Sequence, residues 1–194
     1  MIEPGKFIVL YGANNLGKST QTQLLEQGLQ QRNIPVARLK YPIYDIPSGI
    51  QISNELRGGV RTMTDLQLQQ LFVQNRHDFQ SELMAMLSTG TWVVAEDYTG
   101  TGIAWGVTNG IPLDVLEEMN QNLLREDLGI LLDGDRYVGG IEKGHRHEEG
   151  GKWAEARATH LELAKRYGWE TVNANGSPET IHAAIIDTIQ GKFF

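Results

Sequence analysis

The residues best suited to chemistry lie near the amino terminus, in the stretch YGANNLGKST at positions 11–20. Two glycines, Gly12 and Gly17, are five residues apart, and Lys18 and Ser19 follow the second one directly. Glycines let the backbone turn its N–H groups toward an anion, and a helix that begins here adds partial positive charge. The lysine can then reach terminal phosphates and the serine hydroxyl can ligate Mg²⁺. A glycine-rich turn without a ligand is the alternative, and the position between an expected strand and an expected helix argues against it.

Two further pairs of residues suggest a metal ligand and a second binding site. Glu96 and Asp97 end an apolar run, where a carboxylate beside a phosphate-binding loop can hold Mg²⁺ or its water. A solvated loop is the alternative for this pair. Phe72 and Arg76 are four residues apart and therefore share one face of an expected helix. They suit a flat ligand with polar edges, such as a base, but also an ordinary core edge with a snorkelling arginine.

The elements that must position these residues alternate between strands and helices. Apolar runs predict strands at residues 6–12, 36–40, 91–96, 128–133 and 170–173. Helical spacing and capping signals predict helices at residues 19–32, 46–56, 64–89, 113–124, 153–167 and from 177 onward. This order predicts an α/β chain in which about five mainly parallel strands carry helices on both faces. With the glycine-lysine-serine loop after the first strand, it predicts the P-loop NTPase fold. We expect residues 1–194 to form a single domain, with ligands beyond the carboxyl ends of the strands.

One charged insert interrupts this order. Residues 142–151, EKGHRHEEGG, are flanked by glycines, and we expect them to form a short lid. His145 and His147 are one residue apart within it, so a metal site is an alternative to two solvated histidines.

Composition excludes several other functions. The chain has 194 residues, 40% of them hydrophobic, which is enough for a sizeable core. Its net charge of −7 argues against a surface for nucleic acid or an anionic membrane. Cysteine is absent, which excludes disulfides, thiolate metal sites and a cysteine nucleophile. Since neither a signal peptide nor a long apolar span is evident, we expect a cytoplasmic protein.

Four segments together resemble the thymidylate kinase family of nucleoside monophosphate kinases. In order, they are FIVLYGANNLGKSTQTQLL, LFVQNRHDF, GTWVVAEDYTGTGIAWG and GHRHEEG, and they extend over most of the chain. The resemblance implies transfer of the terminal phosphoryl group of ATP to a deoxynucleoside 5′-monophosphate, typically dTMP, with Mg²⁺ as cofactor. It also implies a homodimer formed through helix packing.

The resemblance further implies roles for individual residues. Lys18, Glu96 and Arg146 would be catalytic, and Ser19 and Glu96 would hold the metal. The residues expected to bind ATP are Gly12, Asn14, Asn15, Leu16, Gly17, Lys18, Ser19, Thr20, Lys143, Arg146 and Asn175. The residues expected to bind the acceptor are Tyr44, Phe72, Arg76, Asp97, Tyr98, Gly102 and Trp105. Among them, Phe72 would stack on the base, Arg76 would bond its edge and Trp105 would lie near the sugar.

The sequence departs from the family pattern where the acceptor phosphate is expected. The family's Asp-Arg-Tyr reads EDY at 96–98, so Asp97 replaces an arginine that clamps this phosphate, and an arginine often found near Tyr44 is absent. Arg57, Arg61 or a metal ion bridged by Asp97 are the candidate substitutes. Two alternatives therefore stay open: a kinase for another nucleotide or a nucleoside, and a nucleotide-binding protein or switch that has lost catalysis.

The phosphate-binding loop departs from the pattern as well. Asn14 stands where the family usually has an acid, and Asn15 stands where some members carry a catalytic arginine. Members without that arginine generally supply one from the lid, where Lys143 and Arg146 are placed to do so.

Overall fold

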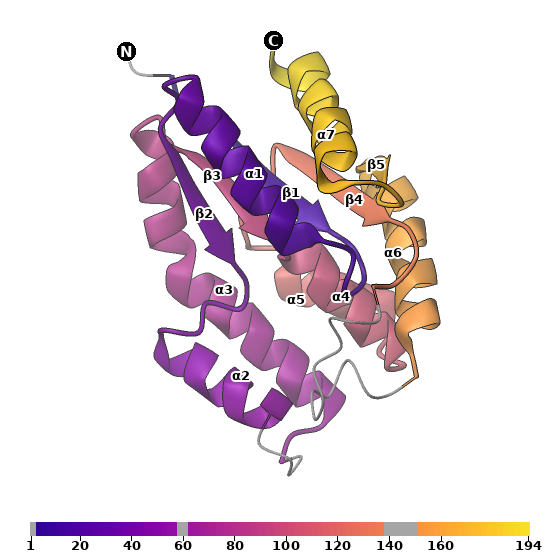
Figure 1. Ribbon diagram of the computed structural model, residues 1–194. Coiled ribbons are helices and arrows are strands. Elements are labelled where there is room, and N and C mark those ends of the chain that lie inside the picture. Colours follow the sequence, from indigo (N-terminus) through magenta and orange to yellow (C-terminus); the bar gives the residue numbers. More distant parts are fainter. Residues whose placement is uncertain (1–2, 58–61, 138–150) are drawn as a thin grey trace.

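A five-stranded parallel sheet forms the centre of the molecule in the computed structural model, which describes residues 3–57, 62–137 and 151–194 (Figure 1). Its strands lie in the order β2-β3-β1-β4-β5, and all neighbouring pairs are parallel. The strands are β1 (Phe7–Tyr11), β2 (Val36–Lys40), β3 (Trp92–Glu96), β4 (Leu128–Asp133) and β5 (Glu170–Asn173). This architecture confirms the predicted fold class.

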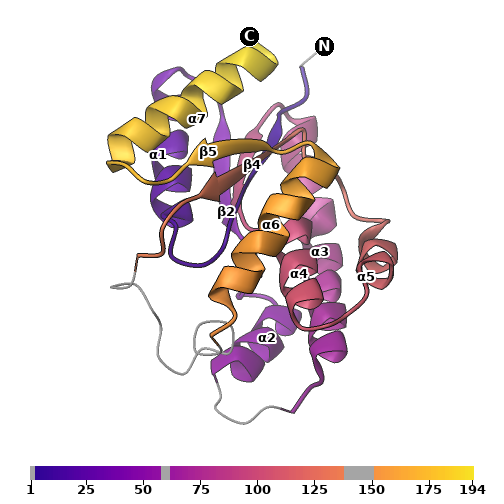
Figure 2. The same cartoon turned by 90° about the vertical axis from the view of Figure 1, so that its right-hand side faces the viewer.

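Helices cover both faces of the sheet, as Figure 2 shows: α1 and α7 lie on one side, and α3, α4 and α6 on the other. The helices are α1 (Lys18–Gln31), α2 (Pro47–Arg57), α3 (Asp65–Ser88), α4 (Thr99–Thr108), α5 (Leu113–Asn120), α6 (Trp153–Tyr167) and α7 (Pro178–Phe193). Among the described residues, no helix is both long and apolar enough to cross a membrane.

The central strand β1 explains why the sequence shows an apolar run rather than an alternating pattern. Phe7, Val9 and Tyr11 belong to the core beneath α3, α4 and α6, whereas Ile8 and Leu10 belong to the core beneath α1 and α7. All five side chains are completely buried. A strand covered on both faces requires apolar residues at every position.

The capping signals act as the sequence predicts. The Oγ1 atom of Thr64 accepts a hydrogen bond from the backbone N–H of Gln67, and Oε1 of Gln67 accepts one from the N–H of Thr64. This reciprocal pair is a capping box and fixes the start of α3. Ser177 accepts from the N–H of Thr180 at the start of α7.

The structure differs from the predicted elements in two places. Helix α4 was not expected, because it contains Gly100, Gly102 and Gly106 and glycine disfavours helix interiors. Tertiary packing selects glycine here, since a Cβ at Gly106 would lie 2.6 Å from Leu116 Cδ1. The predicted helix at 113–124 ends earlier, at Asn120, and the N–H of Leu124 donates to Oε1 of Gln80 on α3 instead.

Candidate functional site

The loop between β1 and α1 has the backbone of an anion-binding site. Gly12, Asn15 and Gly17 all have positive φ values, of 144°, 65° and 81°. A Cβ at Gly12 would lie 2.7 Å from the carbonyl oxygen of Leu132, so β4 leaves room only for glycine. Gly17 precedes α1 without a side-chain cap, which leaves the first N–H groups of the helix available to an anion.

Lys18 is held inside this loop. Its Nζ donates to the carbonyl oxygens of Gly12, at 2.8 Å, and Ala13, at 3.0 Å, and the side chain is only 5% exposed. The same ammonium lies 3.6 Å from Oδ1 of Asp97 at the end of β3. The lysine is therefore fixed at the centre of the loop, where terminal phosphates of a nucleotide would meet it.

Ser19 and Glu96, the two predicted metal ligands, meet beside the loop. Ser19 Oγ donates to Glu96 Oε2 at 2.6 Å, and Glu96 is 6% exposed. A carboxylate and a hydroxyl are hard oxygen donors that suit Mg²⁺. Within the described part of the chain, no three His, Cys, Asp or Glu side chains gather as a metal cage. An ion at Ser19 and Glu96 would therefore need water and phosphate oxygens to complete its coordination, which is the usual state of Mg²⁺ in nucleotide sites.

Lys40, which the sequence analysis did not single out, joins this pair from the end of β2. The β2–β3 register pairs it with Glu96, and its Nζ lies 2.9 Å from Glu96 Oε1 and 3.5 Å from Ser19 Oγ. Partial burial lowers the pKa of Lys40, but attraction to Glu96 outweighs this effect and the pKa is raised overall. The position of Lys40 at a strand end beside an expected metal ligand was the signal that could have identified it.

Asp97 is held in an unusual backbone conformation directly after β3. Its φ is 61°, its N–H donates to the carbonyl oxygen of Leu10, and its Oδ1 accepts from Thr101 Oγ1 at 2.8 Å. Burial raises the pKa of Asp97 above its ordinary value, and the nearby ammonium of Lys18 partly opposes this shift. Asp97 thus places a carboxylate in the site at the position where the family pattern has an arginine.

Arg76 crosses from α3 to the start of α4 rather than reaching out to solvent. Its Nη2 donates to the carbonyl oxygen of Tyr98 at 2.9 Å, and its Nη1 donates to Oδ1 of Asn120 at 3.3 Å. The side chain is 4% exposed, so the snorkelling alternative does not apply. Its Nε is buried and has no hydrogen-bond partner in the part of the chain that the structure describes. Gly102 lies against the guanidinium, where a Cβ would approach Nη2 to 2.6 Å.

One cavity of about 860 Å³ joins the phosphate-binding loop to the region around Arg76. It lies beyond the carboxyl ends of β1, β2 and β3, as expected for a parallel sheet. The predicted site residues that line it are Asn14, Asn15, Leu16, Gly17, Lys18, Ser19, Thr20, Tyr44, Phe72, Arg76, Glu96, Asp97, Tyr98, Gly102 and Trp105. The fold therefore brings residues from distant parts of the sequence into one space.

Asn175, predicted to bind ATP, lies in the loop after β5, and its role in binding stays a prediction. Its Oδ1 accepts from the backbone N–H of Asp135 at 2.7 Å and so ties the loop after β5 to the loop after β4. Of the described residues in this loop, Ala174 and Gly176 line the cavity, whereas Asn175 turns its amide toward Asp135. This hydrogen bond therefore connects the loops that follow β4 and β5.

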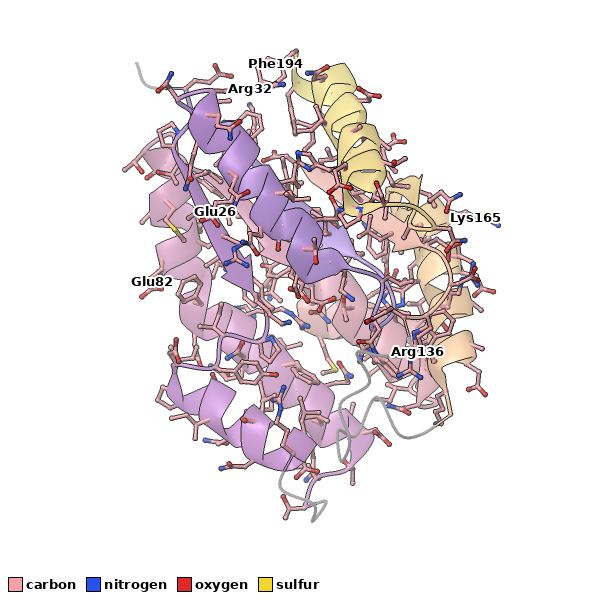
Figure 3. All side chains as sticks on the ribbon, viewed as in Figure 1. Glu26, Arg32, Glu82, Arg136, Lys165 and Phe194 are labelled. Carbon is pink, nitrogen blue, oxygen red and sulfur yellow. The ribbon has the colours of Figure 1, made fainter. Side chains whose placement is uncertain are left out.

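Trp153, at the start of α6, was also missed and contacts the phosphate-binding loop directly. Its Nε1 donates to the carbonyl oxygen of Asn14 at 2.7 Å. The guanidinium groups of Arg136 and Arg157 lie 5.9 and 5.8 Å from its ring centroid, and Figure 3 labels Arg136 beside α6. The sequence gives no sign of this contact because 139 residues separate its two partners.

Several predicted residues lie outside the described residues. Lys143 and Arg146, most of the lid expected at 142–151, and the histidine pair at 145 and 147 fall within 138–150. Arg61, a candidate for the acceptor phosphate, falls within 58–61. Their expected roles stay predictions.

Comparison with known proteins adds an independent line of argument. Residues 10–185 match the family model described as thymidylate kinase. The thymidylate kinase of Dictyostelium discoideum is 28% identical over 197 residues, covering 100% of this chain and 88% of that protein. The thymidylate kinase of Plasmodium falciparum is 30% identical, covering 95% of this chain and 90% of that protein.

Solved structures of similar proteins share the fold. The thymidylate kinase of Candida albicans has a TM-score of 0.84 at 22% identity and covers 97% of this chain and 92% of its own. That of Ehrlichia chaffeensis has a TM-score of 0.79 at 18% identity and covers 96% of this chain and 100% of its own. The fold is therefore retained across nearly the full length of the chain.

Proposed function

We propose, because the chain belongs to the thymidylate kinase family, that it transfers the terminal phosphoryl group of ATP to a deoxynucleoside 5′-monophosphate, most readily dTMP. The observation that supports this most directly is the single cavity shared by the phosphate-binding loop and the Phe72–Arg76 face of α3. A donor phosphate and an acceptor base placed at its two ends would bring the reacting groups together between them.

The donor end stabilises negative charge in advance. The N–H groups at the start of α1 and the ammonium of Lys18 would bind the phosphates that lie against the loop. Ser19 and Glu96 would hold Mg²⁺, which supplies charge neutralisation on the transferred group when it is bound. Because these groups are fixed by the loop and by β3, they need little rearrangement as charge develops.

The acceptor end offers surfaces for a base and a sugar. Phe72 provides an aromatic face, and the buried Arg76 provides N–H donors for the polar edge of a pyrimidine. Tyr98 positions Arg76 through its carbonyl oxygen, and Gly102 leaves the space that the guanidinium occupies. Trp105, 5% exposed, closes this end of the cavity, where we place the deoxyribose.

The experiment that tests the proposal is a coupled assay of diphosphate formation with ATP and Mg²⁺. The acceptors dTMP, dUMP, dGMP, dCMP, AMP and thymidine would each be offered separately, with EDTA as the metal control. We expect dTMP to give the highest kcat/KM and EDTA to abolish turnover. A higher kcat/KM for another acceptor would contradict the assignment of dTMP as the preferred acceptor. No turnover with any acceptor would contradict the proposed kinase activity.

Two further expectations stay predictions, namely the homodimer formed through helix packing and the cytoplasmic location. Sedimentation equilibrium of the purified chain tests the first, and fractionation of the source cells tests the second.

A further inference from the structure

Lys40 occupies a position between the metal ligands and the open cavity. Its ammonium lies 2.9 Å from Glu96 Oε1 and 3.5 Å from Ser19 Oγ, the two residues proposed to hold Mg²⁺. The side chain is nevertheless 58% exposed and lines the cavity. Lys40 therefore balances the charge of Glu96 while its end group stays accessible to a ligand.

Three of the four other cations that line the described part of the cavity make contacts away from Lys40. Lys18 bonds two carbonyl oxygens inside the loop, and Arg76 bonds the carbonyl oxygen of Tyr98 on the side of the base. Arg136 lies against Trp153 at the donor end. Arg57, at the end of α2, lies 5.1 Å from the ring centroid of Tyr44 and is the remaining competitor of Lys40.

Binding of Mg²⁺ at Ser19 and Glu96 would change the surroundings of Lys40. A divalent ion at Ser19 and Glu96 would take over the carboxylate to which the ammonium is bonded, and two cations at this separation repel each other. Asp97 also attracts the ammonium of Lys40, but its carboxylate is already held by Lys18 and Thr101. With its bond to Glu96 weakened by such an ion, the ammonium of Lys40 would be available to another anion.

We propose that Lys40 binds the 5′-phosphate of the acceptor nucleotide, exchanging the carboxylate of Glu96 for that phosphate when the metal and the donor nucleotide occupy the site. The inference rests on the proposed function. It gives a reason for an exposed ammonium at the carboxyl end of β2, and it supplies a cation in a part of the cavity where Asp97 adds negative charge.

The test measures equilibrium binding without turnover. Isothermal titration calorimetry with saturating ADP and Mg²⁺ gives the Kd of dTMP and, separately, of thymidine, which lacks the phosphate. For Lys40→Ala we expect the Kd of dTMP to rise roughly tenfold or more, because a charge-assisted hydrogen bond is lost. The Kd of thymidine should change less than twofold, and Lys40→Arg should recover most of the affinity for dTMP.

The matched control is Arg38→Ala on the same strand. Arg38, like Lys40, is a basic residue on β2 that pairs with a glutamate. Its Nε lies 3.1 Å from Oε2 of Glu26 on α1, and Figure 3 labels Glu26. Arg38 is not among the cavity-lining residues of the described chain, so its loss should leave the Kd of dTMP within twofold.

The Kd of ADP with Mg²⁺ should be unchanged or lower in Lys40→Ala, because Glu96 no longer has to release the ammonium.

Three outcomes would overturn the inference. The first is an unchanged Kd of dTMP in Lys40→Ala, and the second is an equal loss for dTMP and thymidine, which would indicate a general disturbance of the site. The third is a loss confined to Arg57→Ala, which would assign the phosphate to Arg57. These outcomes differ from a failure of the proposed function, in which the wild-type chain itself would bind no dTMP.

Discussion

Gly102 on α4 lies directly against the guanidinium of Arg76 on α3. A Cβ at position 102 would stand 2.6 Å from Nη2 and 3.2 Å from Nη1 of Arg76, well inside van der Waals contact. The same Nη2 donates to the carbonyl oxygen of Tyr98, so the position of the arginine is fixed from two sides. The absence of a side chain at Gly102 therefore allows the guanidinium of Arg76 to occupy its place at the acceptor end of the cavity.

Substitution of Gly102 by alanine should weaken acceptor binding selectively. The new methyl group must displace the guanidinium, which loses its bond to Tyr98, so we expect the KM for dTMP to rise roughly tenfold or more while the KM for ATP stays within twofold. Steady-state kinetics measure both constants. Gly191→Ala in α7, where a Cβ would meet no atom within 4 Å, is the matched control and should change neither. An unchanged KM for dTMP in Gly102→Ala would place the base elsewhere.

Loss of the loop lysine should strongly slow transfer without unfolding the chain. Lys18→Ala removes the ammonium that is bonded to Gly12 and Ala13, and we expect kcat to fall by about 10² to 10³ because a preorganised charge is lost. The measurement is turnover with dTMP, with circular dichroism to verify the fold. Lys165→Ala, an exposed lysine in the last turn of α6 (Figure 3), is the control and should retain full activity. Substantial turnover by folded Lys18→Ala would contradict the role of the loop.

The indole of Trp153 should contribute to binding of the donor nucleotide. Trp153→Phe keeps a ring near Arg136 and Arg157 but removes the donor to the carbonyl oxygen of Asn14. A neutral hydrogen bond contributes about 1 kcal/mol, so we expect the Kd of ADP with Mg²⁺ to rise about fivefold. Calorimetry measures it, and Trp92→Phe, whose indole packs on Phe193, is the control. Equal affinities of Trp153→Phe and the wild type would show that the loop does not depend on this bond.

His160 should make the stability of the fold depend on pH. The ring is 1% exposed and its Nδ1 lies 2.7 Å from the carbonyl oxygen of Ala156, so a neutral ring protonated at Nδ1 satisfies this carbonyl. Burial is the main reason that the pKa of His160 is lowered from 6.5 to about 4. The unfolded chain takes up the proton first as the pH falls, so stability is lost between pH 6.5 and pH 4, by up to about 3 kcal/mol.

Urea unfolding at several pH values measures this contribution. The free energy of unfolding of His160→Gln should fall less between pH 6.5 and pH 4 than that of the wild type, because one titrating group is removed. His77→Gln on α3 is the control for the replacement of a histidine by glutamine. Parallel curves for wild type and His160→Gln would show that His160 does not cause the pH dependence.

The sequence by itself determined the five strands, every helix of the described residues except α4, and the phosphate-binding loop between β1 and α1. Local signals suffice for these features: an apolar run predicts a buried strand, a capping box at Thr64 predicts the start of α3, and the glycines around Lys18 predict an anion-binding turn. The pairing of Phe72 with Arg76 also follows from helical periodicity. Each of these depends on residues that are close together in the sequence.

Only the tertiary structure decided which distant residues meet. The β2–β3 register brings Lys40 to Glu96, packing of α6 brings Trp153 to Asn14, and a hydrogen bond brings Asn175 to the backbone of Asp135. Helix α4 was missed for the same reason, since its glycines oppose a helix locally and are selected by the side chains of Arg76 and Leu116. Local propensity contains no information on these contacts, because the free energy that favours them arises only when the elements pack.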